Sequence, residues 1–243
     1  MKELVRVSKL MSERGLCSRR EADVYIKQGL VRVNGQVIST LGSKATFDAE
    51  IELLEKAVKE QEQKLTILLN KPVGFVSTQP EKGYRAAIEL IEKENQYQDG
   101  SWQEFSPYHR KKLAVAGRLD IDSKGLLILT QDGTIARQLI GEHSEVEKEY
   151  LVRVEGKITK AAIEKLSFGL SLDGKELKKA KVTQLEENIL KFILKEGKKR
   201  QIRRMCELCD LKAQGIKRVR IGKVRLGKLP EGKWRYLRKD EFF

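Results

Sequence analysis

The residues with the clearest potential for chemistry stand near the middle of the chain, at positions 117–120, which read Gly-Arg-Leu-Asp. An apolar run at 126–129 follows, so Asp120 is expected in a loop just before a strand. A carboxylate held among basic residues has the chemistry of a nucleophile or a general base. The residues alone leave a simpler alternative open, in which Asp120 is a surface aspartate paired with Arg118.

The cysteines and histidines offer little alternative chemistry. Cys206 and Cys209 have the Cys-x-x-Cys spacing, but zinc would need about two more ligands. The remaining cysteine and the histidines stand at unrelated spacings: Cys17, His109 and His143. The pair also falls on an expected helix over 201–209, which favours core or surface thiols. The sequence contains no phosphate loop or dinucleotide fingerprint, so it predicts neither a metal site nor a cofactor.

The charge of the chain points to a polyanionic partner. The 243 residues include 49 Lys and Arg against 35 Asp and Glu, a formal net charge of +14. The excess is concentrated in residues 1–45 and 195–243. Such patches commonly bind nucleic acid, although a solvated, solubilising face is the alternative. Candidate contacts lie near the starts of two N-terminal helices and on an alternating strand that ends at 226: Arg6, Lys9, Arg19, Arg20, Lys217, Arg218 and Arg220.

Composition restricts the class of protein further. Hydrophobic residues make up 40% of the chain, which is enough to build packed cores. The longest apolar runs are far shorter than the ~20 residues that cross a bilayer. Three cysteines in a chain of this length are typical of a reducing compartment. We therefore expect a cytoplasmic protein with no membrane partner, and nothing in the sequence requires more than a monomer.

The first 60 residues read as a separate module. A helix is expected over 8–15, and a second begins at Ser18 with Glu21 three positions later, which is the spacing of a capping box. Asn34-Gly35 predicts a tight hairpin, and another strand follows near 50–54. Residues 56–64 are charged and lack an apolar stripe, so they are expected to be the linker.

Residues 65–243 read as a larger α+β domain. Strands that alternate in polarity without a helix after each one predict a mixed, mainly antiparallel sheet flanked by helices. The expected strands are 65–70, 75–77, 115–116, 126–130, 150–154, 181–185, 190–194 and 219–226. The expected helices are 85–93, 134–140, 160–166 and 201–209.

Two resemblances to known families rest on these motifs. Residues 4–55, with their Ser-Arg-Arg-Glu-Ala helix start and Val-Asn-Gly turn, resemble the S4 RNA-binding domain. The Gly-Arg-Leu-Asp segment resembles the catalytic loop of pseudouridine synthases. Three further segments fit that family in the same order, at 70–78 (an opening strand and turn), 148–150 (Lys-x-Tyr) and 201–205 (Gln-Ile-Arg-Arg-Met). Within that family, the chain most resembles the ribosomal synthases that include small-subunit synthase A and large-subunit synthases B, E and F. It resembles large-subunit synthase F especially.

The resemblance implies a reaction and roles for particular residues. It implies that a uridine in RNA becomes pseudouridine without metal or cofactor, with Asp120 as the essential carboxylate. Arg203 matches the family's salt-bridge partner of that aspartate, and Tyr150 matches the residue that stacks on the uracil. Arg118, from its position alone, is expected to fill the gap left by a flipped base or to hold the backbone.

The expected partner is ribosomal RNA, with 23S RNA first, and three alternatives stay open. The same chemistry on 16S RNA is one, and the same chemistry on transfer RNA is another. The third is a non-catalytic RNA-binding or ribosome-assembly protein. Val115-Ala116, Gln131 and a long loop over 96–112 depart from the family pattern, which puts the exact target in question more than the chemistry.

Overall fold

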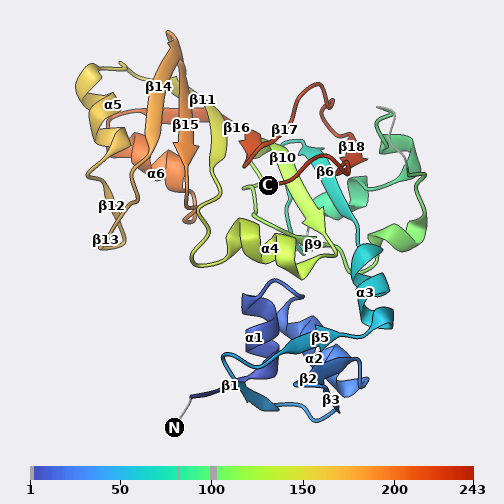
Figure 1. Ribbon diagram of the computed structural model, residues 1–243. Helices are drawn as coiled ribbons and strands as arrows, with labels where there is room; N and C mark the ends of the chain where they lie inside the picture. Colours follow the sequence, from blue (N-terminus) through green and yellow to red (C-terminus); the bar gives the residue numbers. More distant parts are fainter. Residues whose placement is uncertain (1–2, 81–82, 99–102) are drawn as a thin grey trace.

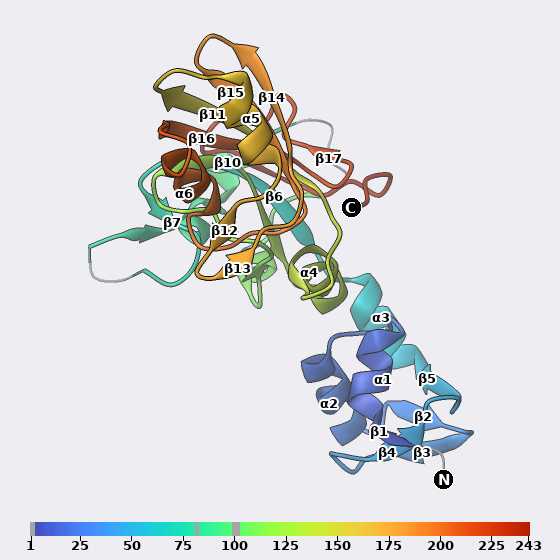
Figure 2. The same ribbon diagram turned by 90° about the vertical axis from the view of Figure 1, so that its left-hand side faces the viewer.

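The computed structural model describes residues 3–80, 83–98 and 103–243. Figure 1 shows a small N-terminal unit, coloured blue, and a larger unit that holds the rest of the chain. Helix α3 (Glu55–Glu62) joins them, as the turned view in Figure 2 also shows. Within the described ranges, no helix combines the length and the apolarity that crossing a membrane requires.

Two helices and two small sheets build the N-terminal unit. These elements are α1 (Val7–Glu13), α2 (Arg19–Lys27), β1 (Leu4–Arg6), β2 (Val31–Val33), β3 (Gln36–Ile38), β4 (Lys44–Thr46) and β5 (Ile51–Leu53). The sheets have the orders β3-β2-β5 and β1-β4, and α1 packs against α2. Buried side chains from all parts of the unit, among them Leu10, Met11 and Ile26, form one apolar cluster.

The local signals in this unit are confirmed. The Ser18 hydroxyl accepts a hydrogen bond from the backbone amide of Glu21 at 3.4 Å, and the Glu21 carboxylate accepts one from the Ser18 amide at 2.8 Å. This reciprocal pair is the capping box that starts α2. At the β2–β3 turn, Asn34 and Gly35 have φ angles of 47° and 80°, as a type I′ turn requires.

The linker segment is helical, which its lack of an apolar stripe did not predict. Ala57 is the one residue of α3 that is fully buried, so the helix has almost no apolar face to recognise in the sequence. Polar contacts hold it instead. Gln61 Nε2 donates to the Tyr25 hydroxyl at 2.8 Å, and Lys64 forms an ion pair with Glu21.

The larger unit is built on a nine-stranded sheet. Its strands are β6 (Thr66–Lys71), β9 (Ala114–Val115), β10 (Ser123–Thr130), β11 (Lys148–Glu155), β14 (Lys181–Glu186), β15 (Ile189–Leu194), β16 (Lys212–Ile221), β17 (Val224–Arg225) and β18 (Trp234–Tyr236). The main path is β14-β15-β11-β16-β10-β6-β18, with β9 beside β10 and β17 beside β16. Only β10 and β16 run parallel among these pairs.

Helices pack on this sheet at three places. Helix α4 (Gly133–Ile140) contacts β10, α5 (Lys160–Ser167) contacts β14, and α6 (Gln201–Glu207) contacts β16. Two small strand pairs lie outside the sheet: β7 (Phe75–Val76) with β8 (Arg85–Ala86), and β12 (Ser171–Leu172) with β13 (Lys175–Glu176). The α+β class and the mixed, mainly antiparallel sheet flanked by helices are confirmed.

Strand β10 lies at the centre of the core. Leu127 and Leu129 belong to one apolar cluster, while Leu126 and Ile128 belong to another. Successive side chains of a strand point to opposite faces, so the unbroken apolar run places β10 in the core on both faces of the sheet. The loop that precedes β10, at 117–122, is therefore attached to one of the most firmly packed strands of the protein.

Two element predictions are wrong. The expected helix over 85–93 is replaced by β8 and two short 3-10 turns, at Ala87–Leu90 and Lys93–Asn95. Ala87 and Ile91 stand four positions apart, which is a helical spacing. Both are buried, but they belong to an irregular segment packed on the core. The expected strand over 219–226 is two strands, β16 and β17, joined by a turn at Gly222, where φ is +54°.

The two units touch where α4 meets the N-terminal helices. Arg137 donates to the backbone carbonyl of Ser12 and, at 2.9 Å, to its hydroxyl. A Cβ atom on Gly133 would lie 2.3 Å from the Cβ of Ser18. Glycine at 133 therefore permits a close approach of α4 to the start of α2 that any side chain would prevent.

We expect Gly133→Ala to separate the two units without unfolding either one. The added methyl group clashes with Ser18, so the contact must open. The radius of gyration from small-angle X-ray scattering should increase, and trypsin should cut near α3 several-fold faster. Gly215→Ala is the matched control, because a Cβ there meets nothing within 4 Å. Identical scattering from both variants would contradict the prediction.

Candidate active site

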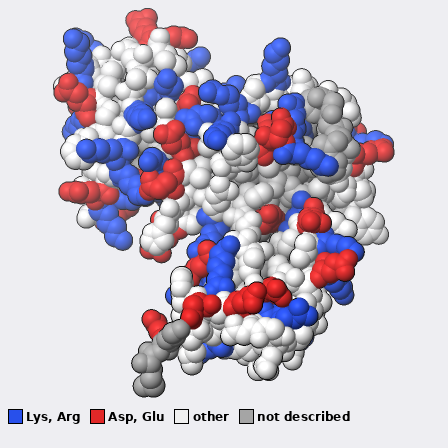
Figure 3. All heavy atoms as spheres, in the orientation of Figure 1, with Lys and Arg blue, Asp and Glu red and all other residues white. Residues whose placement is uncertain are grey.

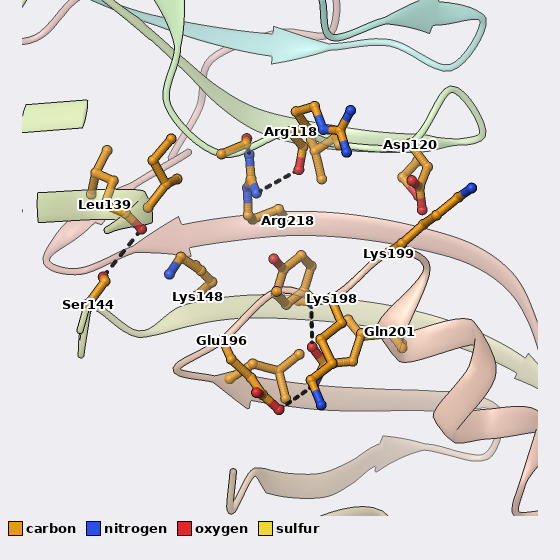
Figure 4. A pocket seen from close by; sticks show the side chains of 18 of the residues that line it. Arg118, Asp120, Leu139, Ser144, Lys148, Glu196, Lys198, Lys199, Gln201 and Arg218 are labelled. Atoms are coloured by element: carbon orange, nitrogen blue, oxygen red, sulfur yellow. Dashed lines mark hydrogen bonds between the residues drawn. The ribbon is translucent and has the colours of Figure 1, made fainter. Parts of the chain in front are cut away.

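A cavity of about 590 Å³ opens beside β11, β16 and the loop that enters β10. Figure 4 shows its lining from close by. Asp120 and Arg118 come from the loop, and Tyr150 comes from β11. Lys148 and Arg218 line the same cavity. The fold thus brings together the carboxylate and the aromatic ring that the sequence singled out.

The backbone around Asp120 is fixed while its carboxylate is left free. Ser77 binds Leu119 twice, accepting from its amide at 2.9 Å and donating to its carbonyl at 2.6 Å. The Ser123 amide donates to the Asp120 carbonyl at 3.1 Å, and Gly117 adopts a φ of +99° at the start of the turn. No hydrogen bond or ion pair to the Asp120 carboxylate occurs within residues 3–80, 83–98 and 103–243. The carboxylate is available to a substrate.

Arg203 does not pair with Asp120, which corrects the expected salt bridge. Its Nη2 atom lies 3.0 Å from Oδ2 of Asp122 and donates to the Asp122 carbonyl at 3.2 Å. Its Nη1 atom donates to the Ala213 carbonyl at 2.6 Å. Arg200 also pairs with Asp122, at 3.3 Å. The buried Arg203 therefore anchors the loop to α6 and β16, two residues after Asp120.

Arg218 is buried, which corrects its expected place among the RNA contacts. Its exposed fraction is 2%. Nε donates to the carbonyl of Leu126 at 2.7 Å, Nη2 to that of Gly117 at 2.8 Å and Nη1 to that of Arg118 at 3.4 Å. The guanidinium thus joins the start of the Asp120 loop to strand β10. It also lies 6.0 Å from the centre of the Tyr150 ring.

A β-bulge explains why the expected basic face of the strand does not exist. Tyr150 is opposite Arg218, but the preceding Glu149 is opposite Arg220, so Val219 is an extra residue in β16. Arg218 therefore shares a face with Tyr150, whereas Arg220 shares the other face with Glu149. Arg220 pairs with Glu149 at 2.9 Å and with Glu147 at 3.0 Å. It is committed to the protein itself, and this corrects its assignment to RNA.

The other basic candidates remain at the surface. Arg6, Lys9, Arg19 and Arg20 are exposed, and Arg19 and Arg20 are the first two residues of α2. Arg118 is exposed at the cavity, and Lys217 is half-buried on β16. On the face drawn in Figure 3, basic side chains are interspersed with acidic ones and form no unbroken patch. The net charge is therefore a poor guide to which basic residues meet RNA.

Lys71 is a buried titratable residue for which the sequence predicted no role. It has no exposed surface, and its ammonium donates to the carbonyls of Pro72 and Phe75, both at 2.8 Å. Burial lowers the pKa of Lys71 to about 8, although the nearby Asp122 and Asp120 act in the opposite direction. Its place in the Asn-Lys-Pro motif was visible in the sequence, but its burial was not.

The cysteine pair lies in the core. All three cysteines are buried, and burial raises the pKa of Cys206 to about 12. The thiol is therefore protonated at neutral pH and a poor nucleophile. Across the part of the chain that the structure describes, no group of three or more His, Cys, Asp or Glu side chains is arranged to hold a metal ion.

Lys71 predicts a specific pH dependence of stability. The folded protein holds the Lys71 proton less tightly than the unfolded chain, so folding releases it between pH 8 and 10.5. The wild type should gain stability relative to Lys71→Met as pH rises through that interval, by up to about 3 kcal/mol. Urea unfolding at several pH values measures this gain. The exposed control Lys56→Met should show no trend, and a constant difference for Lys71→Met would contradict the prediction.

Comparison with known proteins identifies two families that the chain matches. Residues 65–208 match the family model described as RNA pseudouridylate synthase, and residues 5–51 match that of the S4 domain. The chain is 36% identical over 239 residues to the dual-specificity RNA pseudouridine synthase RluF of Escherichia coli (strain K12), covering 98% of this chain and 77% of that protein.

Two further relatives agree. An uncharacterized RNA pseudouridine synthase of Aquifex aeolicus (strain VF5) is 33% identical over 244 residues, which cover 98% of this chain and 92% of that protein. A crystal structure described as a pseudouridylate synthase matches with a TM-score of 0.65 and 26% identity, covering 97% and 96% of the two chains. The chain therefore belongs to the RNA pseudouridylate synthase family and is an RNA pseudouridine synthase with an N-terminal S4 domain.

Proposed function

We propose that the protein converts a specific uridine of ribosomal RNA, in the first instance 23S RNA, to pseudouridine through Asp120. The observation that carries the proposal is the carboxylate of Asp120, which no residue of the described ranges binds, in a cavity shared with Tyr150. Because the related RluF is described as dual-specificity, 16S RNA and transfer RNA belong in the same substrate test.

Asp120 acts on the sugar of the target nucleotide. The N1–C1′ bond breaks, the uracil turns, and a C5–C1′ bond forms, after which the C5 proton is lost and N1 gains one. An ionised carboxylate begins this sequence either as a nucleophile on C1′ or as the base that takes a ribose proton. Both roles need a carboxylate without a permanent partner, and that of Asp120 has none in the part of the chain that the structure describes.

The target uridine reaches the cavity by leaving its stack. A base held in a helix cannot approach Asp120, so it must be flipped. Tyr150 supplies an aromatic wall on which the uracil stacks, and it assists the late proton transfer. Arg118 is exposed at the cavity, where its side chain fills the gap in the RNA or holds the neighbouring backbone.

The N-terminal unit holds the RNA outside the cavity. Arg6, Lys9, Arg19 and Arg20 contact phosphates, helped by the backbone amides of Arg19 and Arg20 in the first turn of α2. We assign RNA binding to residues 1–60 and the chemistry to residues 65–243. The protein acts as a monomer, in the cytoplasm where its ribosomal RNA substrate is found.

Asp120→Asn should abolish pseudouridine formation. The amide is neither a nucleophile nor a base, so the rate should fall at least a hundredfold. The measurement is carbodiimide mapping of uridines in unmodified 23S, 16S and transfer RNA after incubation with enzyme. The control is Asp210→Asn, an exposed aspartate outside the cavity in a left-handed conformation that Asn also adopts. Equal yields from Asp120→Asn and wild type would refute the assignment.

Replacing Arg19 and Arg20 by alanine together should weaken RNA binding and reduce its salt dependence. Each lost phosphate contact lowers the slope of log affinity against log salt by roughly 0.7 to 0.9. Binding to transcribed ribosomal RNA is measured across a salt series. Arg32→Ala is the control in the same unit, because Arg32 pairs with Glu52 at 3.3 Å. A slope unchanged from wild type would remove α2 from the RNA interface.

A further inference from the structure

Lys148 is a largely buried lysine whose side chain lines the wall of the active-site cavity. It is the first residue of β11, and its exposed fraction is 8%. It lines the cavity with Tyr150, and Figure 4 shows its side chain among the lining residues. The proposed roles of Asp120, Tyr150 and Arg118 do not involve it.

Lys148 has no partner among the residues that the structure describes. Its Nζ atom donates no hydrogen bond there and lies within 4.0 Å of no carboxylate. Two other lysines of the cavity differ, because Lys178 and Lys195 both pair with Glu145, at 2.7 and 2.9 Å. Lys71 is also buried, but it has two carbonyl acceptors.

The surroundings of Lys148 make its charge unfavourable. Burial lowers its pKa, and the nearby cations Arg218 and Lys178 lower it further. A buried charge without a compensating partner reduces stability, so such groups are uncommon unless a ligand supplies the missing acceptor. An anion entering the cavity would provide it.

The position of Lys148 on the strand indicates which part of the RNA supplies that anion. Lys148 and Tyr150 are two residues apart on β11, so they share a face and are separated by about 6.7 Å along the strand. This separation is comparable with the span of a single nucleotide. With the uracil against Tyr150, a phosphate next to the same nucleotide falls near Lys148, and phosphates carry the charge of RNA.

We propose that Lys148 binds the backbone phosphate adjacent to the uridine that stacks on Tyr150. The proposal deepens the proposed function and rests on it for the identity of that nucleotide. The ammonium acts as a point charge on a non-bridging phosphate oxygen. It holds the flipped nucleotide from its backbone while Tyr150 holds the base and Asp120 approaches the sugar.

Substituting Lys148 in the full-length chain tests this contact. Lys148→Met should weaken binding to transcribed ribosomal RNA about tenfold and lower its salt slope by about 0.7 to 0.9, and Lys148→Arg should restore most of both. Lys148→Met should also raise the melting temperature, because it removes a charge that partial burial and the nearby cations Arg218 and Lys178 disfavour. A lysine that only supported the fold would lower it. The exposed Lys212→Met, at the far end of the β11–β16 pair, is the control.

A chemical change in the RNA locates the contact. In an RNA segment that the enzyme modifies, the phosphate on one side of the target uridine and then that on the other is replaced by an uncharged methylphosphonate. One replacement should raise the wild-type KM about tenfold but the Lys148→Met KM less than twofold. The proposal would be overturned if, at both phosphates, the methylphosphonate and Lys148→Met raised KM independently, so that their effects multiplied. It would also be overturned if Lys148→Met reduced kcat and left KM unchanged, which would indicate a contact to the base.

The outcome separates this proposal from the proposed function. If Lys148→Met converts uridines with unchanged KM and salt slope, the phosphate contact is wrong and the function stands. If RNA binding depends on Lys148 but wild type converts no uridine in 23S, 16S or transfer RNA, the function is wrong and the contact stands.

Discussion

The guanidinium of Arg218 is enclosed between β16 and the loop that precedes β10, where it donates to the carbonyls of Gly117, Arg118 and Leu126. A carbonyl left buried without a donor costs about 1 to 3 kcal/mol, so the loop is strongly held. The close approach of β10 to β16 also depends on Gly125, because a Cβ there would lie 2.3 Å from the Arg218 carbonyl oxygen. Since Arg218 is opposite Tyr150 in the sheet, one residue sets the loop and the aromatic wall relative to each other.

The basic residues of this chain consequently divide into two groups. Arg203, Arg218 and Arg220 satisfy internal carbonyls and carboxylates, and they reinforce the β16 side of the cavity. Arg19 and Arg20, at the start of α2, face solvent. A net charge therefore overstates the surface available to RNA, although a buried cation without a carboxylate partner still contributes a positive potential to the cavity.

Sequence reasoning succeeded where the determinants are local. The Ser18–Glu21 capping box and the Asn34-Gly35 turn depend on neighbouring residues, and both were predictable. Family resemblance placed Asp120 and Tyr150, and the fold brings them to one cavity. The wrong prediction of a basic face on β16 concerns a feature that depends on pairing across the sheet. The bulge at Val219 reverses the face of Arg220 relative to Arg218, and no pattern within β16 reveals a residue that lacks a partner on β11.

The partner of Arg203 shows how the loop is anchored without use of the Asp120 carboxylate. Asp120 and Asp122 are two residues apart, yet Arg200 and Arg203 both bind Asp122. In the proposed mechanism, an arginine bound directly to Asp120 would occupy carboxylate lone pairs that the sugar requires. Placing the ion pairs on Asp122 instead fixes the loop and leaves Asp120 near the buried ammonium of Lys71. The loop thus assigns its ion pairs to Asp122, while the carboxylate of Asp120 is bound by no residue within 3–80, 83–98 and 103–243, as the proposed mechanism requires.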